Sequence, residues 1–165
     1  VLEHALEQGW VLDAAVAQSQ SDADDFWALR DSVAEMLDSY APTLNFDISF
    51  PISQIGVCVE RLRQIMDEMF PDIHAMYFGH VGDGNLHVVV GPLPDDRQQT
   101  QREMEEAFYG VTRELGGSVS AEHGIGTHKK PYLGHSRSQA EVDLIKRMKC
   151  ALDPKGILNP GKIVD

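Results

Sequence analysis

The Asp83-Gly84 dipeptide lies between two apolar, β-rich runs at residues 73–81 and 86–91, and it constrains the fold more than any other feature. This dipeptide between such runs favours a two-residue type I′ turn, and therefore a β-hairpin. The turn predicts three opposed pairs: Gly82 with Asn85, Val81 with Leu86, and His80 with His87. Because side chains alternate along a strand, both histidines are expected on the same face of the sheet.

Regular elements are predicted on both sides of the hairpin. Four helices are predicted from the helical spacing of apolar residues and from residues typical of helix ends. The first covers residues 22–40 and is capped by Ser21, and the second lies between Ser53 and Pro71. The third runs from Pro94 to Gly116-Gly117, and the fourth begins with the capping box Ser138–Glu141. Strands are expected at 44–50 and 118–122. The order from 44 to 122 is β-α-β-β-α-β, the split βαβ pattern of a ferredoxin-like fold. We therefore expect an α+β protein whose antiparallel sheet carries helices on one face, followed by a C-terminal helix and tail.

Composition narrows the class of protein. A length of 165 residues favours a single domain over 1–165, and a net charge of -12 argues against a nucleic-acid partner. No apolar run reaches the length of a membrane span, and Cys58 and Cys150 form no CxxC motif. We expect a cytoplasmic protein, with peripheral membrane association of the full-length form as the alternative. The chain starts at Val1 without methionine, so we expect a fragment of a longer protein.

The two hairpin histidines admit several interpretations. Directly opposed residues have Cβ atoms about 5 Å apart, close enough for His80 and His87 to bind one cation. The other face, with Leu86, Val88 and Val90, is expected to pack under the helices. The histidines could therefore be a metal-binding pair, a catalytic pair, or two unrelated polar surface groups.

A second cluster lies at the end of the strand predicted at 118–122. Glu122 would complete a two-histidine, one-carboxylate ligand set that suits zinc, manganese or iron, and His123 could act as a base beside the metal. Gly124 and Gly126 are expected to let backbone or ligand come close. The alternative is that Glu122 pairs with a nearby lysine, Lys129 or Lys130.

The expected strand order conflicts with a site that combines Glu122 with the two histidines. In a 4-1-3-2 sheet the hairpin lies at the opposite end from the end of strand four, which would separate Glu122 from both histidines. Either an extra strand near residues 10–18 changes the order, or loops carry Glu122 back. Residues 1–18 alone are ambiguous between strand and helix.

Three blocks of the sequence resemble the C-terminal domain of FAD-linked oxidases of the vanillyl-alcohol-oxidase superfamily. They are FGHVGDGNLH (78–87), GGSVSAEHGIGTHKKPYL (116–133) and DPKGILNPGKIV (153–164), with weaker matches in FWALRDSV (26–33) and FDISFPIS (46–53). The family includes D-lactate dehydrogenases, D-2-hydroxyglutarate dehydrogenases and glycolate oxidase flavoprotein subunits. The blocks appear in family order over roughly residues 10–165, and the resemblance favours the strand interpretation of 10–18.

The resemblance implies roles for individual residues. His80, His87 and Glu122 correspond to ligands of a divalent metal, zinc or manganese. Asn85 corresponds to a substrate contact, and His123 to a substrate-binding general base.

Three further positions follow from the same resemblance. Arg30 corresponds to an arginine that pairs with a substrate carboxylate, and Asn159 lies in a tail segment expected to run near the flavin. Asn45 stands where family members often have a lysine that helps to hold hydroxyglutarate. The loss of that cation favours a monocarboxylate substrate.

The function implied is the substrate- and metal-binding part of an FAD-dependent enzyme that oxidises a D-2-hydroxy acid to the 2-oxo acid. Nothing in the chain resembles a glycine-rich pyrophosphate loop, so FAD is expected to be held mainly by a separate N-terminal domain, and the isolated chain is expected to be inactive. The electron acceptor would be oxygen, a quinone or an electron-transfer protein, and an uncovered domain surface could allow a homodimer. Alternatives are a stand-alone metal-binding regulatory module on a ferredoxin-like scaffold, and a metal-dependent hydrolase.

Overall fold

A computed structural model describes residues 1–80 and 82–165 of the chain. Internal contacts divide it into two compact units, Val1–Ser39 and Tyr40–Asp165, and we describe each by itself. Among the described residues, no helix has the length and apolar character needed to cross a membrane.

The first unit consists of helices α1 (Leu2–Glu7), α2 (Gln20–Asp31) and α3 (Val33–Asp38). The predicted helix at 22–40 begins earlier, because a cap at Ser19 lets the Asp22 side chain bond back to the Ser19 amide, and it is interrupted at Ser32. The strand interpretation of residues 10–18 is wrong, since no strand forms there. A strand needs a neighbour for its backbone groups, and this helical unit offers none.

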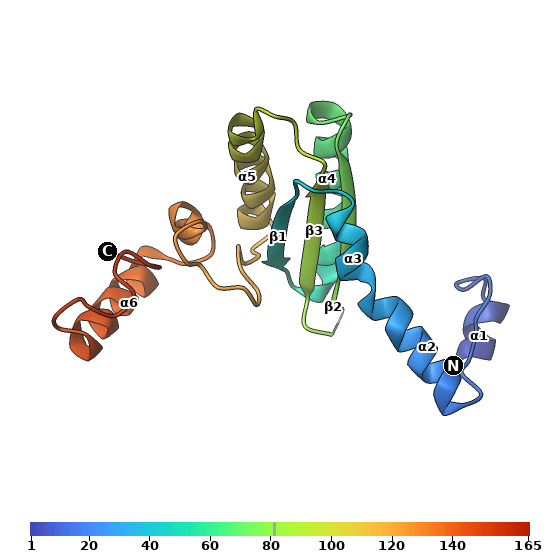
Figure 1. The fold of residues 1–165 in the computed structure, drawn as a ribbon. Coiled ribbons are helices and arrows are strands. Elements are labelled where there is room, and N and C mark those ends of the chain that lie inside the picture. The colour runs from blue at the N-terminus through green and yellow to red at the C-terminus, as the bar shows by residue number, and fades with distance from the viewer. Residues whose placement is uncertain (81) are drawn as a thin grey trace. The chain divides into compact units, whose positions relative to one another are not determined.

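The second unit is built on an antiparallel sheet of β1 (Leu44–Ser49), β2 (His74–His80) and β3 (Asn85–Gly91) in the order β1-β3-β2. Its other elements are η1 (Ile52–Gln54), α4 (Ile55–Met69), α5 (Arg97–Glu114), η2 (Lys130–His135) and α6 (Gln139–Leu152). Figure 1 shows their arrangement. The predicted α+β class is confirmed, as is the Ser138–Glu141 capping box that opens α6.

The strand predicted at 118–122 is reduced to a single bridge between Ser118 and Ser49. The bridge lies on the free side of β1, where strand four of a 4-1-3-2 sheet would pair. Beyond it no regular strand forms along β1, because the amides of residues 121–123 bond to the Asp47 side chain, and the Ala121 amide also lies 3.3 Å from the Asp47 main-chain oxygen.

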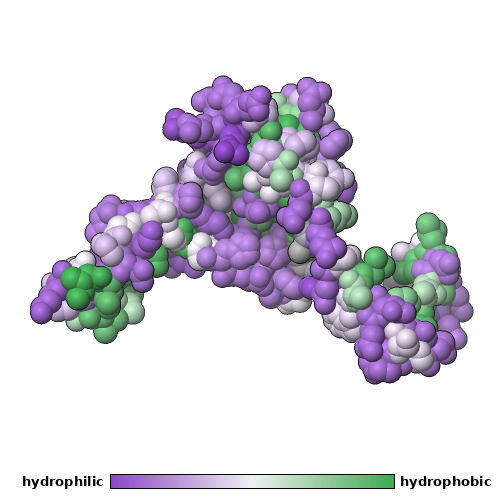
Figure 2. Space-filling model, viewed as in Figure 1, coloured by the Kyte–Doolittle hydropathy of each residue, from purple (hydrophilic) through white to green (hydrophobic). Residues whose placement is uncertain are grey.

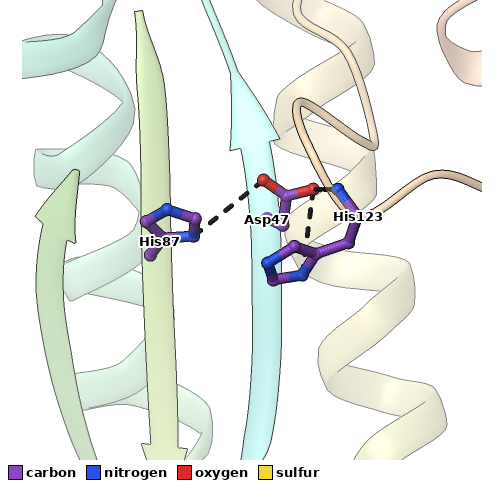
Figure 3. Close-up of side chains that lie close together, drawn as sticks. All are labelled: Asp47, His87 and His123. Carbon is purple, nitrogen blue, oxygen red and sulfur yellow. Dashed lines mark hydrogen bonds and ion pairs between the residues drawn. The ribbon is translucent and has the colours of Figure 1, made fainter. Parts of the chain in front are cut away.

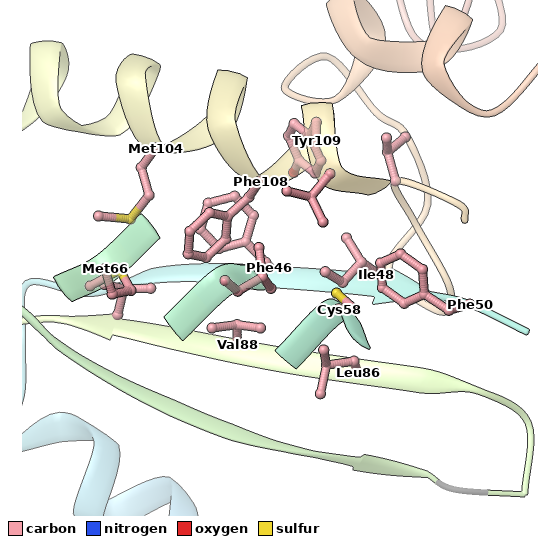
Figure 4. Close-up of a cluster of buried hydrophobic side chains, with 14 of the residues drawn as sticks. Phe46, Ile48, Phe50, Cys58, Met66, Leu86, Val88, Met104, Phe108 and Tyr109 are labelled. Carbon is pink, nitrogen blue, oxygen red and sulfur yellow. The ribbon is translucent and has the colours of Figure 1, made fainter. Parts of the chain in front are cut away.

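One face of the sheet forms the core with α4 and α5. Phe46, Ile48, Leu86, Val88 and Val90 are at most 5% exposed and pack against buried residues of both helices: Cys58, Leu62, Met66, Met104 and Phe108 (Figure 4). Each such apolar side chain contributes about 1.5–3 kcal/mol to folding. The expected core assignment of Leu86, Val88 and Val90 is confirmed.

The hairpin forms as expected, but its register differs from the prediction by two residues. His80 pairs with Asn85 and Phe78 with His87, so the two histidines are diagonal neighbours. The connection is longer than a two-residue turn, and the amides of Asp83 and Gly84 both donate to the His80 carbonyl oxygen. A shift of two residues preserves the face of every side chain, so both histidines still share one face. The predicted Val81–Leu86 pair lies outside the described residues.

Candidate metal and substrate site

The candidate site occupies the sheet face turned away from α4 and α5, which we call the site face. Cross-strand pairing arranges its side chains in three rows: Ser49–Asn85–His80, Asp47–His87–Phe78 and Asn45–Val89–Met76. Polar and titratable groups are concentrated in the first two rows, next to the hairpin connection. Strand pairing therefore gathers residues from three separate parts of the chain.

Glu122 joins the two hairpin histidines on this face. Its Oε1 lies 3.6 Å from His80 Nε2, and its Oε2 lies 3.8 Å from His87 Nε2. The two imidazole rings meet edge to face at 5.7 Å between centroids. The three predicted ligands therefore converge, and the conflict over sheet order is resolved by a loop that brings Glu122 back.

This donor set fits a small divalent metal ion. One ligand atom from each of the three residues lies within 4.8 Å of the other two. Ligand atoms about 2.1 Å from a tetrahedral zinc ion are about 3.4 Å apart, close to the distances observed from Glu122 to each histidine. Two imidazoles and one carboxylate would leave a coordination position for substrate.

Asp47 of β1 holds the segment that carries Glu122. Its Oδ2 accepts backbone N–H groups from Ala121 (3.1 Å), Glu122 (3.0 Å) and His123 (2.8 Å). The Ser120 hydroxyl lies 3.1 Å from the same oxygen. The segment after Ser118 consequently folds over the site face and does not form a fourth strand beside β1.

The Asp47 carboxylate is completely buried and charged. Burial alone would raise its pKa, but hydrogen bonds from the His123 and Glu122 amides and the charge of Lys129 outweigh this and lower the pKa to about 2. The Lys129 ammonium lies 3.4 Å from Asp47 Oδ2, and burial lowers the pKa of Lys129 while Asp47 opposes that effect. The two buried charges thus compensate each other.

His123 lies beside His87 on the site face (Figure 3). Their rings stack at 5.6 Å with an interplanar angle of 25°, and His123 Nδ1 is 4.0 Å from Asp47 Oδ2. The side chain is 58% exposed, so a small molecule can reach the His123 ring. This arrangement suits a group that exchanges a proton with a bound ligand.

Asn85 is 3% exposed and lies at the foot of the hairpin. Its Nδ2 is 3.4 Å from His87 Nε2, while its buried Oδ1 has no hydrogen-bond partner among the described residues. An unpaired buried carbonyl costs about 1–3 kcal/mol, a cost that a ligand donor would remove.

Comparison with known proteins places this geometry in context. The sequence model of the family "FAD linked oxidases, C-terminal domain" matches residues 1–163. The chain belongs to this family. It is 38% identical over 165 residues to the D-2-hydroxyglutarate dehydrogenase of Stutzerimonas stutzeri (strain A1501), covering 98% of the chain and 35% of that protein.

Eukaryotic relatives give similar matches. The mitochondrial D-2-hydroxyglutarate dehydrogenase of Rattus norvegicus is 39% identical over 162 residues, covering 98% of the chain and 30% of that protein. The Arabidopsis thaliana protein of the same name is 35% identical over 160 residues, covering 97% and 28%. This FAD linked oxidase C-terminal domain therefore spans about a third of the length of these curated relatives.

Two further predicted site residues lie outside the three strands of the sheet. Arg30 belongs to the first unit, where it pairs with the neighbouring Asp31 at 2.9 Å and is 66% exposed. Asn159 lies in the exposed C-terminal tail with a left-handed backbone (φ 46°). Their roles toward substrate and flavin stay predictions.

The alternative partners of Glu122 are wrong. Lys129 pairs with Asp47, and Lys130 pairs with Asp165. At Gly124 and Gly126 no chain atom lies within 4 Å of a Cβ, although the Ile163 amide donates to the Gly126 carbonyl oxygen at 2.9 Å, and the approach of a ligand there stays a prediction. Both glycines adopt positive φ angles that bend the chain after Glu122.

Asp47 and its partners Ser120 and Lys129 are the site residues that sequence reasoning missed. The alternation of LNFDIS did place Asp47 on the polar face of its strand. A carboxylate in a strand flanked by core residues is unusual, and that was the available signal.

Proposed function

We propose that this chain is the substrate- and metal-binding part of an FAD-dependent dehydrogenase that oxidises a D-2-hydroxy acid to the corresponding 2-oxo acid. The observation that carries the proposal is the convergence of His80, His87 and Glu122 with Asn85 and His123 on one face of the sheet. Family membership and the names of the relatives support the reaction class.

The proposed metal ligands are His80, His87 and Glu122, with zinc or manganese as the ion. A metal held by these three residues would favour loss of the proton from a coordinated hydroxyl group, and FAD, when bound, would supply the hydride acceptor. His123 would take the hydroxyl proton at Nε2, since its Nδ1 is turned toward Asp47. Asn85 would donate to or accept from the bound acid and fix its orientation.

The substrate class within the D-2-hydroxy acids depends on a second cation. The relatives are named for D-2-hydroxyglutarate, which carries two carboxylates. Asn45 lies on the site face one row beyond Asp47 and supplies no charge there. We therefore propose that a monocarboxylate such as D-lactate is favoured, with D-2-hydroxyglutarate as the second candidate.

The two substrates can be separated in the full-length flavoenzyme. We expect a higher kcat/KM for D-lactate than for D-2-hydroxyglutarate, and we expect Asn45→Lys to shift the ratio toward the dicarboxylate. A clearly higher kcat/KM for D-2-hydroxyglutarate in the unaltered enzyme would contradict the monocarboxylate proposal.

The partner proposed for this chain is the FAD-binding domain of the same protein. Helix α6 exposes Leu144, Met148 and Leu152 at intervals of four residues, and Ile157 and Leu158 follow, each at least 52% exposed (Figure 2). Such an apolar stripe favours burial against another domain. A quinone or an electron-transfer protein is proposed as electron acceptor, and association of exposed stripes into a homodimer is proposed for the chain alone.

The central experiment measures the first turnover of the full-length enzyme as flavin reduction by a D-2-hydroxy acid. We expect His123→Ala to slow flavin reduction by about 10²–10⁴-fold, as loss of a general base does. His128→Ala is the matched control and should leave the rate unchanged. Equal rates in both variants would refute the role of His123.

Metal content provides an independent test. The purified chain should contain or take up one divalent ion, and His87→Ala should abolish this. Stoichiometric metal in the variant would contradict the ligand assignment. If the chain binds metal but the full-length protein shows no flavin reduction by any 2-hydroxy acid, the stand-alone metal-binding module becomes the better account.

A further inference from the structure

The Asp47 carboxylate divides its contacts between two parts of the site. Its Oδ2 accepts the three consecutive amides of residues 121–123, so it fixes the backbone on which Glu122 is carried. Its Oδ1 lies 3.9 Å from His87 Nδ1, while the other ring nitrogen of His87, Nε2, faces Glu122. One side chain therefore contacts both halves of the ligand set.

We propose that Asp47 is a positioning residue that sets the affinity of the chain for a divalent metal. It holds Glu122 over the hairpin, and it orients His87 so that Nε2 faces the other ligands. This inference rests on the metal site of the proposed function and adds to it a residue outside the proposed ligand set of His80, His87 and Glu122.

The chemistry of the contact requires a carboxylate. Three N–H groups and the Lys129 ammonium converge on one oxygen, and a carboxylate offers only acceptors. Asparagine would present either a donor or a single neutral oxygen to this group of donors. Loss of the negative charge would also leave Lys129 uncompensated and remove the charge that favours a proton on His87 Nδ1.

The chain contains a matched control for this arrangement. Asp153, at the end of α6, accepts the amides of Ile157 and Leu158 and pairs with Lys149. It therefore anchors a loop by a similar combination, with two amides and a lysine where Asp47 has three amides and a lysine. No member of the histidine cluster bonds to it among the residues that the structure covers.

The test is calorimetric titration of zinc into the 165-residue chain and its Asp47→Asn, Asp153→Asn and His87→Ala variants. We expect Asp47→Asn to weaken zinc binding by about 10–100-fold, the effect typical of losing an outer partner of a metal ligand. Asp153→Asn should stay within about twofold of the unaltered chain. Equal zinc affinity of Asp47→Asn and the unaltered chain would overturn the inference while leaving the metal site intact.

Two readouts keep the test decisive if Asp47→Asn folds poorly. In the zinc-free unaltered chain, the Glu122 and His123 amides should exchange hydrogen slowly, and exchange at the rate of an unstructured peptide would overturn the inference. The ¹⁵N spectrum of His87 should show the proton on Nδ1, and a proton on Nε2 would also count against it. If neither the unaltered chain nor His87→Ala binds zinc, the proposed metal site fails, and amide exchange alone decides whether Asp47 positions the segment.

Discussion

The two halves of the candidate site are held in place by different physical means. His80, Asn85 and His87 are fixed by pairing between adjacent strands, in which backbone hydrogen bonds recur along the whole register. Glu122 and His123 are fixed by one carboxylate that lies 75 or more residues earlier in the chain. The hairpin half therefore distributes its stability over many bonds, whereas the Glu122 half depends on one buried group.

The largest expected effect comes from a substitution at a close backbone contact between β2 and β3, in the hairpin half. A Cβ at Gly79 would lie 2.2 Å from the Asn85 carbonyl oxygen, and neither backbone can move without disturbing the pair. We expect Gly79→Ala to lower the free energy of unfolding by about 3 kcal/mol and to abolish zinc binding. Urea unfolding measures this.

The control for Gly79→Ala is Gly56→Ala at the start of α4, where nothing lies within 4 Å. It should be neutral or stabilising by up to about 1 kcal/mol. Equal destabilisation by both substitutions would show that the close contact at Gly79 has no special importance.

A second prediction concerns the cation that compensates Asp47. Lys129→Met should lower the free energy of unfolding by about 2 kcal/mol, because it removes a hydrogen bond between buried charged groups. Lys130→Met is the matched control, since its partner Asp165 is 81% exposed, and it should cost less than about 1 kcal/mol. If Lys129→Met lowers the free energy of unfolding no more than Lys130→Met does, the result would contradict the dependence of the Glu122 half on Asp47.

A fall in pH should weaken the Glu122 half of the site. The pKa of Asp47 is about 2 in the folded chain, below its ordinary value of 3.8, so its contribution is complete above pH 4 and is lost as the pH falls toward 2. The shift corresponds to up to about 2 kcal/mol. Urea unfolding between about pH 5 and about pH 2 should show this loss, and Asp47→Asn should show a flatter profile. Parallel profiles would contradict the assignment.

The smallest expected effect concerns a carboxylate in the hairpin half. Asp83 Oδ1 accepts the Asn85 amide at 3.0 Å, a local bond within the connection. Asp83→Ala should cost only about 1 kcal/mol, because strand pairing still fixes both histidines, and zinc affinity should change little. A loss of zinc affinity as large as that of Asp47→Asn would remove the contrast between the two halves.

The same contrast explains what could be predicted from sequence. The hairpin, the core face and the shared face of both histidines follow from alternation and turn chemistry, which act over a few residues. The register was off by two because the connection closes through two amides on the His80 carbonyl instead of a two-residue turn. The error did not change the face of either histidine.

The position of Glu122 could not be derived from the same rules. Residues 118–122 have the composition of a strand, but the Asp47 carboxylate competes for their amides, and this competition is visible only once β1 and the segment are adjacent. Family resemblance correctly brought Glu122 to the histidines without supplying the cause. It also favoured a strand at 10–18 that does not form.

The most direct test of the account is a crystal structure of the zinc-soaked chain with anomalous data collected at the zinc absorption edge. The account predicts a single strong anomalous peak bonded to His80 Nε2, His87 Nε2 and a Glu122 carboxylate oxygen. No peak at this position, or a peak bound instead by other histidines such as His128 and His135, would contradict the central claim.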